Sequence, residues 1–536
     1  MEELETKDLK IKFLGIIPVL NQETGPLNSQ EIVSFSGLLT FKGKSVQELV
    51  KESLKKGEKI DDKVKGILRR SSLKGHASLS TTPVVSFLYE GSKFLDSLLT
   101  GMYFGSFLVS SGRRTNTSRE DIVFPKGIQE NKEAKRIYLK SSYRKIDFYN
   151  SLLERGVRKD SSSKILQYGI YGTGIIQLPL ESIISFVREY EIEKEWMPEE
   201  AGILIKKLES KFKEAGIDLL YSTRLIAPRN SYPYPNVFKD PKNTNLTREL
   251  VGKKEGDFEI SSSDFNITPG LKKNLEEHLS EIKEMAKSRE GVKKRWQEIM
   301  LSRRKILRDY NLSAKIDILS SVPWRVWGEK KRHRTCPQVI DSIYYCINKA
   351  VDKFEEIKEL IEKGEINQDL VEEIEKVLSI PSVIKNNPDY LEEYLLVAKE
   401  SFESYVELVD LGIKERDAIF LIPRAVKLDI LQSYDLYNLL TGYYPLRLCQ
   451  TAEEEMRSNT LKEVSLIKKH LKEKGVGWMG DLILTKCDLI GFCPEVKECG
   501  HIRKLVKDYD KDFHEEMKEE LENKFQNKLK EINGEE

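Results

Sequence analysis

The chain has 536 residues, of which 39% are hydrophobic and 33% are charged, yet its formal net charge at pH 7 is only +1. The length exceeds what one hydrophobic core usually serves, so two or more domains are expected. The charge balance argues against a nucleic-acid-binding protein with a broad basic face, and the hydrophobic fraction argues against a disordered chain. A charged N-terminal stretch, MEELETKDLKIKFLG, and the lack of a long apolar run predict a soluble, cytoplasmic protein without a membrane span.

Helical periodicity dominates the predicted elements. Residues 10–20 (KIKFLGIIPVL) predict a strand that enters a loop, and helical spacing follows from about residue 29 to about residue 213. Within it, PVVSFLYEG at 83–91 is strand-like. The Pro/Asn-rich stretch 225–246 marks the best domain boundary, and the charged segment 270–310 predicts solvated or packing helices.

The predicted domains follow from this pattern. They are a first module at 1–235, a linker with a charged helical segment at 236–310, a second module at 311–510 and a charged C-terminal helix at 511–536.

Two short segments repeat in order. YNSLLERGV at 149–157 matches YVELVDLGI at 405–413, and each predicts a helix that ends at a glycine, followed by a charged turn and another apolar helix. The following helices contain LESIISF at 180–186 and LYNLLTG at 436–442, at the same offset. One such match is common among helical sequences, but the ordered pair favours a diverged tandem duplication.

A basic cluster stands in the second half, where GEKKRHRTCPQVIDS contains Arg332, His333 and Arg334. Crowded cations repel one another unless an anion binds among them, and arginine offers a planar fork of donors suited to phosphate. A histidine between two arginines is expected to stay neutral at physiological pH. Taken alone, the cluster could also be a solvated basic turn.

This cluster resembles the RHRxxSxNxxSxR signature of the flavin-dependent thymidylate synthases (ThyX). Ser342 matches the late serine of that signature, whereas Tyr344 stands at its final arginine position. Downstream, PLRLCQTAEEEMR at 445–457 resembles the C-terminal helix of the family, with Arg447 on its nucleotide-binding arginine.

The first half resembles other parts of the same family. GHAS at 75–78 is similar to its GHxS stretch, and the terminal arginine of the signature falls on Arg114, beside Arg113. Met102-Tyr103-Phe104 occupies the RHR position, and Tyr190 replaces the arginine of the later helix. The two halves are therefore complementary in what they retain, as expected of two fused modules that share composite sites.

The resemblance implies an α+β, mostly helical fold of two tandem ThyX-like modules, each a small antiparallel sheet flanked by long helices. It implies methylation of dUMP to dTMP with methylenetetrahydrofolate as carbon donor and FAD-mediated hydride transfer from NADPH. It also implies a homodimer that imitates the homotetramer of the family. No nucleic acid, membrane or metal is expected as a partner.

The resemblance also assigns roles to individual residues. Arg332 and Arg447 are the expected catalytic residues. The expected FAD-binding residues are Arg332, His333, Arg334, His76 and Ser78. The expected substrate-binding residues are Arg113, Arg114, Ser342 and Arg447.

Two alternatives stay open on the sequence alone. The missing arginines at Tyr344 and Tyr190 also suit an altered descendant that binds flavin or nucleotide without making thymidylate. Separately, Cys487, Cys493, Cys499 and His501 could hold a structural zinc, but without a CxxC pair buried cysteines are the favoured interpretation.

Overall fold

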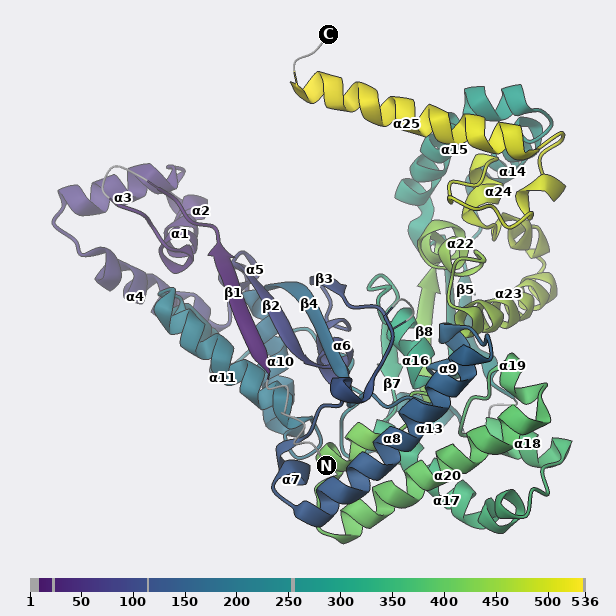
Figure 1. Ribbon diagram of the computed structural model, residues 1–536. Coiled ribbons are helices and arrows are strands. Elements are labelled where there is room, and N and C mark those ends of the chain that lie inside the picture. Colours follow the sequence, from purple (N-terminus) through teal and green to yellow (C-terminus); the bar gives the residue numbers. More distant parts are fainter. Residues whose placement is uncertain (1–8, 22–24, 113–114, 252–255, 534–536) are drawn as a thin grey trace. The chain divides into compact units, whose positions relative to one another are not determined.

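The computed structural model describes residues 9–21, 25–112, 115–251 and 256–533 (Figure 1). Contacts divide the chain into two compact units that alternate along the sequence. Unit 1 comprises Met1–Asn245, Pro323–Arg334 and Ile340–Leu428. Unit 2 comprises Leu246–Val322, Thr335–Val339 and Asp429–Glu536.

The first sheet contains four strands, ordered β1-β2-β4-β3. Their bounds are Lys10–Ile17 for β1, Val84–Ser92 for β2, Ser106–Val109 for β3 and Tyr171–Pro179 for β4. All neighbours pair antiparallel. Val85, Phe87 and Tyr89 of β2 are buried and alternate with more exposed residues, so one face of this sheet packs into the core of unit 1.

The second sheet has the corresponding order, β5-β6-β8-β7. Its strands are β5 (Phe258–Phe265), β6 (Ala314–Pro323), β7 (Gln338–Ile340) and β8 (Lys427–Asp435). The first pair of each sheet also carries a register shift, between Phe13 and Gly15 in β1 and between Ile260 and Ser262 in β5. Two small sheets in a mostly helical chain confirm the predicted α+β class.

Most helices belong to unit 1. They are α1 (Ser29–Ser36), α2 (Leu39–Lys42), α3 (Val46–Lys55), α4 (Ile60–Arg70), α5 (Ser78–Thr81), α6 (Lys93–Leu99), α7 (Lys126–Gln129), α8 (Lys132–Glu154), α9 (Lys159–Ser162), α10 (Leu180–Glu193), α11 (Glu199–Glu214), α12 (Asp218–Leu225), α16 (Trp324–Lys330), α17 (Ile343–Glu362), α18 (Gln368–Glu375), α19 (Ser382–Lys385), α20 (Pro388–Asp410) and α21 (Glu415–Ala418).

Unit 2 has fewer helices. They are α13 (Leu246–Val251), α14 (Pro269–Met285), α15 (Arg289–Tyr310), α22 (Tyr444–Arg447), α23 (Glu454–Glu473), α24 (Lys486–Ile490) and α25 (Lys511–Asn533). Among the described residues, no helix is both long enough and apolar enough to span a bilayer.

The long helices α8 and α20 carry the repeated segments and lie side by side within unit 1 (Figure 1). They have the same length, and both are followed by a left-handed glycine, Gly156 and Gly412, as the repeat predicts. At their contact, Lys145 donates a hydrogen bond to Ser401 at 2.9 Å, and these residues are 256 positions apart. Tyr149 and Tyr405 of the repeat have the same separation, so equivalent positions of the two segments touch each other.

The stretch after each repeated helix differs from the expectation. Strand β4 precedes LESIISF, and strand β8 precedes LYNLLTG. The apolar residues just before each segment pair into a sheet instead of continuing as a helix. LESIISF then opens α10 as predicted, whereas Asn438–Gly442 forms a short π-helical segment.

Candidate functional site

The RHR cluster lies in the loop that follows α16 in unit 1. Helix α16 begins after Pro323 and is anchored by two fully buried indoles, Trp324 and Trp327. Beyond the helix, Arg332, His333 and Arg334 are all half-buried rather than solvated. The Arg334 guanidinium lies 5.0 Å from the ring centroid of Phe107 on β3.

Arg332 lines a small polar cavity made by both halves of the chain, all within unit 1. We call it the cationic cavity. Its volume is about 40 Å³. It is lined by Lys93, Asp96, Ser97, Thr100, Ser110, Ser111, Gly112, Tyr168, Arg325, Gly328, Glu329, Lys331, Arg332 and Arg424. Five lining side chains are cationic and only two are acidic, so the cavity favours an anion.

Two guanidinium groups keep unsatisfied donors at this cavity. Arg424 is 2% exposed, and its Nε donates to the Gln167 carbonyl at 3.0 Å. Its Nη2 has no hydrogen-bond partner among the described residues, and neither does the buried Nε of Arg332. Buried N–H groups are normally paired, so these donors indicate a place for an acceptor.

The other cations of the cavity already have hydrogen-bond or ion-pair partners within the protein. Lys331 donates to the carbonyls of Asp96 and Ser97, at 3.0 and 2.6 Å. Arg325 pairs with Glu329 at 3.1 Å. Lys93 lies 3.5 Å from the Asp96 carboxylate.

Burial disfavours the charged state of these groups. Desolvation lowers the pKa of Arg424 to about 10. Desolvation, followed by repulsion from Arg332, lowers the pKa of Lys331 well below its usual value, and burial lowers that of Lys93 despite Asp96. An anion among these cations would offset that cost.

Part of the cavity wall comes from the first-half loop at 110–112, where a Cβ on Gly112 would lie 3.2 Å from Arg424 Nη1. Arg113 and Arg114 come next in the chain and lie outside the described residues. Their predicted contacts with the substrate remain a prediction.

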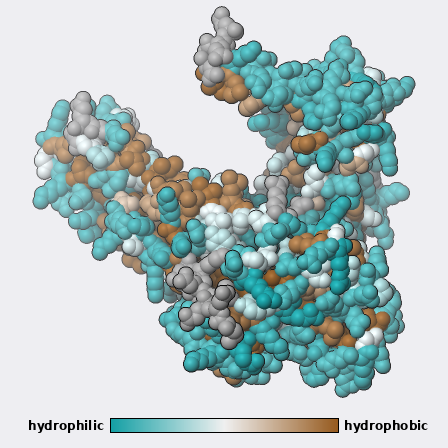
Figure 2. Space-filling view, in the orientation of Figure 1, coloured by the Kyte–Doolittle hydropathy of each residue, from teal (hydrophilic) through white to brown (hydrophobic). Residues whose placement is uncertain are grey.

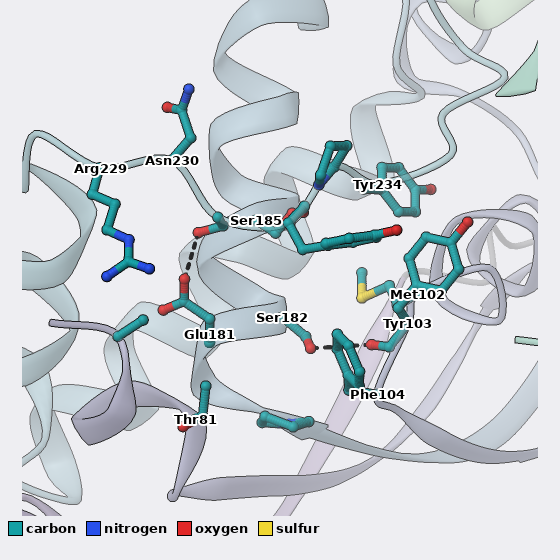
Figure 3. Close-up of a pocket in the computed structure, with 15 residues that line it drawn as sticks. Thr81, Met102, Tyr103, Phe104, Glu181, Ser182, Ser185, Arg229, Asn230 and Tyr234 are labelled. Carbon is teal, nitrogen blue, oxygen red and sulfur yellow. Dashed lines mark hydrogen bonds between the residues drawn. The ribbon is translucent and has the colours of Figure 1, made fainter. Parts of the chain in front are cut away.

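A second, larger pocket of unit 1 lies at the loop that replaces RHR in the first half. We call it the aromatic pocket, and its volume is about 690 Å³. Met102, Tyr103 and Phe104 line one end of it, and Arg229 and Asn230 lie at the other end (Figure 3). Its lining residues are Ala77, Thr81, Met102, Tyr103, Phe104, Pro179, Glu181, Ser182, Ser185, Arg229, Asn230, Ser231, Tyr232, Pro233 and Tyr234.

The polar groups of the aromatic pocket are fixed by internal bonds. The Glu181 carboxylate accepts hydrogen bonds from Ser231 at 2.8 Å and from Arg224 at 2.6 Å. Ser182 donates to the carbonyl of Tyr103 at 3.2 Å. The ring of Tyr103 meets that of Tyr232 edge to face, with centroids 5.1 Å apart. The pocket is therefore a preformed space with aromatic walls.

The GHAS stretch borders this aromatic pocket rather than the cationic cavity. Gly75 has a φ of +91°, and a Cβ there would lie 2.7 Å from Cβ of Arg229, so only glycine fits. Ala77 lines the pocket, whereas the side chains of His76 and Ser78 are exposed. Their predicted contact with flavin stays a prediction.

Of three other positions of the resemblance, Ser342 and Tyr344 face the protein interior and Tyr190 is half-buried. The Ser342 hydroxyl is buried and donates to the Lys239 carbonyl at 2.6 Å. Tyr344, at the final arginine position, is buried and donates to the Trp196 carbonyl. Tyr190 packs so closely on Gly202 that a Cβ there would lie 2.2 Å from its hydroxyl.

Arg447, the remaining predicted residue, ends the short helix α22 in unit 2 and is half-buried. The buried rings of Tyr443 and Tyr444 precede it and pack edge to face, 4.9 Å apart. This aromatic anchor holds the segment that carries the guanidinium.

Sequence reasoning missed several cations of the cationic cavity, namely Lys93, Arg325 and Arg424. One signal was available for Lys93, which begins the helix directly after the strand-like segment at 83–91. Arg424 stands alone in an apolar stretch, FLIPRAV, and an arginine that such a stretch buries needs polar partners.

Comparison with known proteins agrees with the resemblance of the second half. Residues 313–471 match the family described as Thymidylate synthase complementing protein. The flavin-dependent thymidylate synthase of Thermococcus onnurineus is 28% identical over 123 residues, which are 23% of this chain and 49% of that protein. The enzyme of Pyrococcus horikoshii is 32% identical over 124 residues, or 23% of this chain and 50% of the relative. The chain thus spans about half the length of the curated relatives it matches.

Solved structures align with parts of this chain. The UMP/dUMP methylase PolB from Streptomyces cacaoi, bound with 5-Br dUMP, aligns with 42% of this chain and 98% of its own, at 11% identity and a TM-score of 0.33. Thymidylate Synthase X from Helicobacter pylori, with FAD and dUMP, aligns with 40% of this chain and 99% of its own, at 15% identity and a TM-score of 0.30. The likeness is therefore to the thymidylate synthase complementing protein family model, over residues 313–471.

Proposed function

We propose that this protein is a flavin-dependent thymidylate synthase that methylates dUMP to dTMP, with methylenetetrahydrofolate as carbon donor and NADPH as reductant. The observation that carries the proposal is the cationic cavity, in which Arg332 of the RHR cluster meets Lys93 and Arg424. The family match of the second half supports the same reaction class.

The cationic cavity suits a phosphate. FAD and dUMP both carry phosphates, and the unsatisfied donors of Arg332 and Arg424 could be completed by phosphate oxygens. A cavity of about 40 Å³ is small and suits a compact anionic group.

We place a flat ring of the bound flavin or nucleotide in the aromatic pocket. Its volume of about 690 Å³ lies in the range of small-molecule sites. Tyr103, Phe104 and Tyr232 offer ring faces and edges, and Ala77 connects the pocket to the GHAS stretch.

Bound FAD would supply the hydride chemistry of the reaction. The residues of this chain would bind and orient the flavin and the nucleotide, and they would polarise the pyrimidine carbonyls. Arg332 and Arg334 of unit 1 would contact flavin or nucleotide, and His333 would serve as a hydrogen-bond donor or acceptor. The nucleotide contact of Arg447, in unit 2, stays a prediction. Fixed guanidinium groups aimed at pyrimidine oxygens would stabilise developing negative charge, which is electrostatic catalysis without a cysteine nucleophile.

The direct test is product formation by the full-length protein. Purified protein should take up FAD, its flavin absorbance should bleach with NADPH, and dTMP should form from dUMP and methylenetetrahydrofolate. Omission of any one component should abolish dTMP, measured by chromatography. Protein that binds neither FAD nor dUMP would overturn the proposal.

An altered descendant is the second candidate, and the inward-facing residues favour it. The hydroxyls of Ser342 and Tyr344 donate hydrogen bonds to backbone carbonyls, whereas the resemblance implies nucleotide contacts at these positions. Binding of FAD or dUMP without any dTMP would support this candidate over the first.

We also propose that the protein forms a homodimer. The support is an apolar row on the exposed face of the first sheet, where Leu88, Ile175 and Leu108 are in register across β2, β4 and β3. Leu108 is 77% exposed, and hydrophobic residues gather on the surface over this part of unit 1 (Figure 2). Such faces commonly mark contacts between subunits.

A further inference from the structure

Four of the six cysteines of the chain line one small cavity in unit 2, and the RHR chemistry uses none of them. The cavity is formed by Cys449, Gln450, Thr451, Lys486, Cys487, Cys493, Pro494, Glu495, Lys497 and Cys499. Cys449 joins the three cysteines noted in the sequence from a distance in the chain, so the fold has gathered it to the others. All four are free thiols in the structure.

The segment that carries two of these thiols has little regular structure. Residues 491–501 form no helix or strand, between α24 and a short turn at Ile502–Lys504. Its anchors are Phe492 and Cys493, which enter a hydrophobic cluster with Met285 and Val292, while Val496 is 80% exposed. An irregular loop of this length gains order from a cross-link, and thiols at its two ends could provide one.

The spacing of the sulfur atoms distinguishes between kinds of metal site. Thiolates on one tetrahedral zinc lie about 3.8 Å apart, given Zn–S bonds of about 2.3 Å. Among the described residues, the only three ligand atoms within 4.8 Å of one another belong to Cys487, Asp488 and His501. The four thiols therefore surround the cavity without converging on one point. In an iron–sulfur cluster each thiolate binds a different iron, so its sulfur atoms stand apart around the cluster.

The closer group has an explanation without metal. Asp488 accepts the Thr485 N–H at 3.0 Å and completes a capping box at the start of α24. His501 Nε2 lies 2.8 Å from the same carboxylate, as an ordinary ion pair or hydrogen bond.

We propose that Cys449, Cys487, Cys493 and Cys499 hold a [4Fe–4S] cluster. When a preassembled cluster is transferred from a thiolate-bearing donor, each of the four thiols forms a sulfur–iron bond and passes its proton to the donor thiolate that leaves the same iron, so the oxidation state of the cluster core does not change. Lys497 at the cavity would offset part of the negative charge of the four thiolates, whereas Lys486 is paired with Glu495 at 3.2 Å. Since Cys449 follows Arg447 by two residues, the cluster would also fix the chain directly after α22.

The test is the metal content of full-length protein purified anaerobically from iron-supplemented cells. The expected result is about four iron atoms and four acid-labile sulfides per chain, with an electron paramagnetic resonance signal after dithionite reduction. Cys449→Ser and Cys499→Ser should lose most of the iron. Cys346→Ser is the matched control, because Cys346 is buried elsewhere, and it should keep the iron.

A further variant separates the two metal interpretations. His501→Ala should leave the iron content unchanged. One zinc per chain that disappears in His501→Ala would overturn the proposal, as would four freely titratable thiols or disulfides with no metal. The result does not depend on the proposed enzymatic function, because iron and sulfide are counted without FAD or substrate.

Discussion

At the scale of single residues, the GHAS stretch beside the aromatic pocket includes a backbone conformation at Gly75 that other residue types rarely adopt. Gly75→Ala should destabilise unit 1 for two reasons. The alanine would have to adopt a positive φ, and its Cβ would clash with the Cβ of Arg229. The left-handed conformation alone costs about 1–2 kcal/mol, and the steric contact adds to that cost. Thermal denaturation measures the loss.

Gly43 provides the control for this substitution. It has a φ of +61°, but nothing lies within 4 Å of its added Cβ. Gly43→Ala should therefore cost only the conformational part. Equal losses of stability in the two variants would contradict the close approach of Arg229 to Gly75.

Crowded charge in the sequence singles out the RHR cluster, and Arg332 lines a cavity with net cationic lining. The roles assigned to these residues stay predictions. Crowded charge does not single out Lys93, Arg325 or Arg424, and the local signals at Lys93 and Arg424 are too weak to distinguish a buried cation from a solvated one. Their burial results from long-range packing of the two halves, and single-sequence patterns do not report such packing.

At the scale of elements, α14 and α15 form a helical hairpin whose contact is sensitive to acid. The Arg303 Nε donates to His278 Nε2 at 3.0 Å, so this imidazole must be neutral, since a protonated ring could not accept the bond. Burial, followed by repulsion from Arg303, lowers the pKa of His278 to about 3.

The folded state thus binds fewer protons than the unfolded state between about pH 6.5 and pH 3. The free energy of unfolding of the hairpin should fall as pH decreases through this window, by a few kcal/mol at most. In His278→Gln, which keeps an acceptor for Arg303, the fall in melting temperature between pH 7 and pH 4.5 should be smaller. His76→Gln, at an exposed histidine, should behave as the wild type, and equal pH profiles for all three proteins would contradict the assignment.

The helices that carry the repeat were predictable, and most of the strands were not. A glycine near the end of each repeated segment, at 149–157 and at 405–413, predicts the end of a helix. Both helices end just before that glycine. Strands β4 and β8 were missed because a short, mostly apolar run such as YGTGIIQLP has no period that separates a strand from a helix. These runs become strands because β4 pairs with β2 and β8 pairs with β6, and a single sequence does not reveal such long-range pairing.

The whole molecule is best explained by two copies of one module, which remains our inference. Both sheets have the same strand order and both have a register shift in their first pair. Lys145 meets Ser401 at the repeat spacing of 256, and Gln167 bridges Pro423. Contact between equivalent positions is what a two-fold arrangement of identical subunits produces. The cationic cavity, with walls from α6 and α16, fits this arrangement.

The proposed homodimer makes a prediction at this same scale. Leu108→Glu places a charge on the apolar row of the first sheet and should convert a dimer of twice 62.0 kDa into monomers in analytical ultracentrifugation. Leu312→Glu, at a 93% exposed leucine of unit 2, should remain dimeric. A monomeric wild type, or an unchanged Leu108→Glu dimer, would contradict the assignment of this face.

The central claim is that cations from both halves bind one phosphorylated ligand, and calorimetric titration of the full-length protein with dUMP and with FAD tests it most directly. Lys93→Met from the first half and Arg332→Gln from the second should each weaken binding of the same ligand roughly ten- to hundredfold. Arg136→Gln, at an exposed arginine paired with Glu133, should bind as the wild type does. Wild-type affinity for both ligands in the Lys93 and Arg332 variants would contradict the shared site.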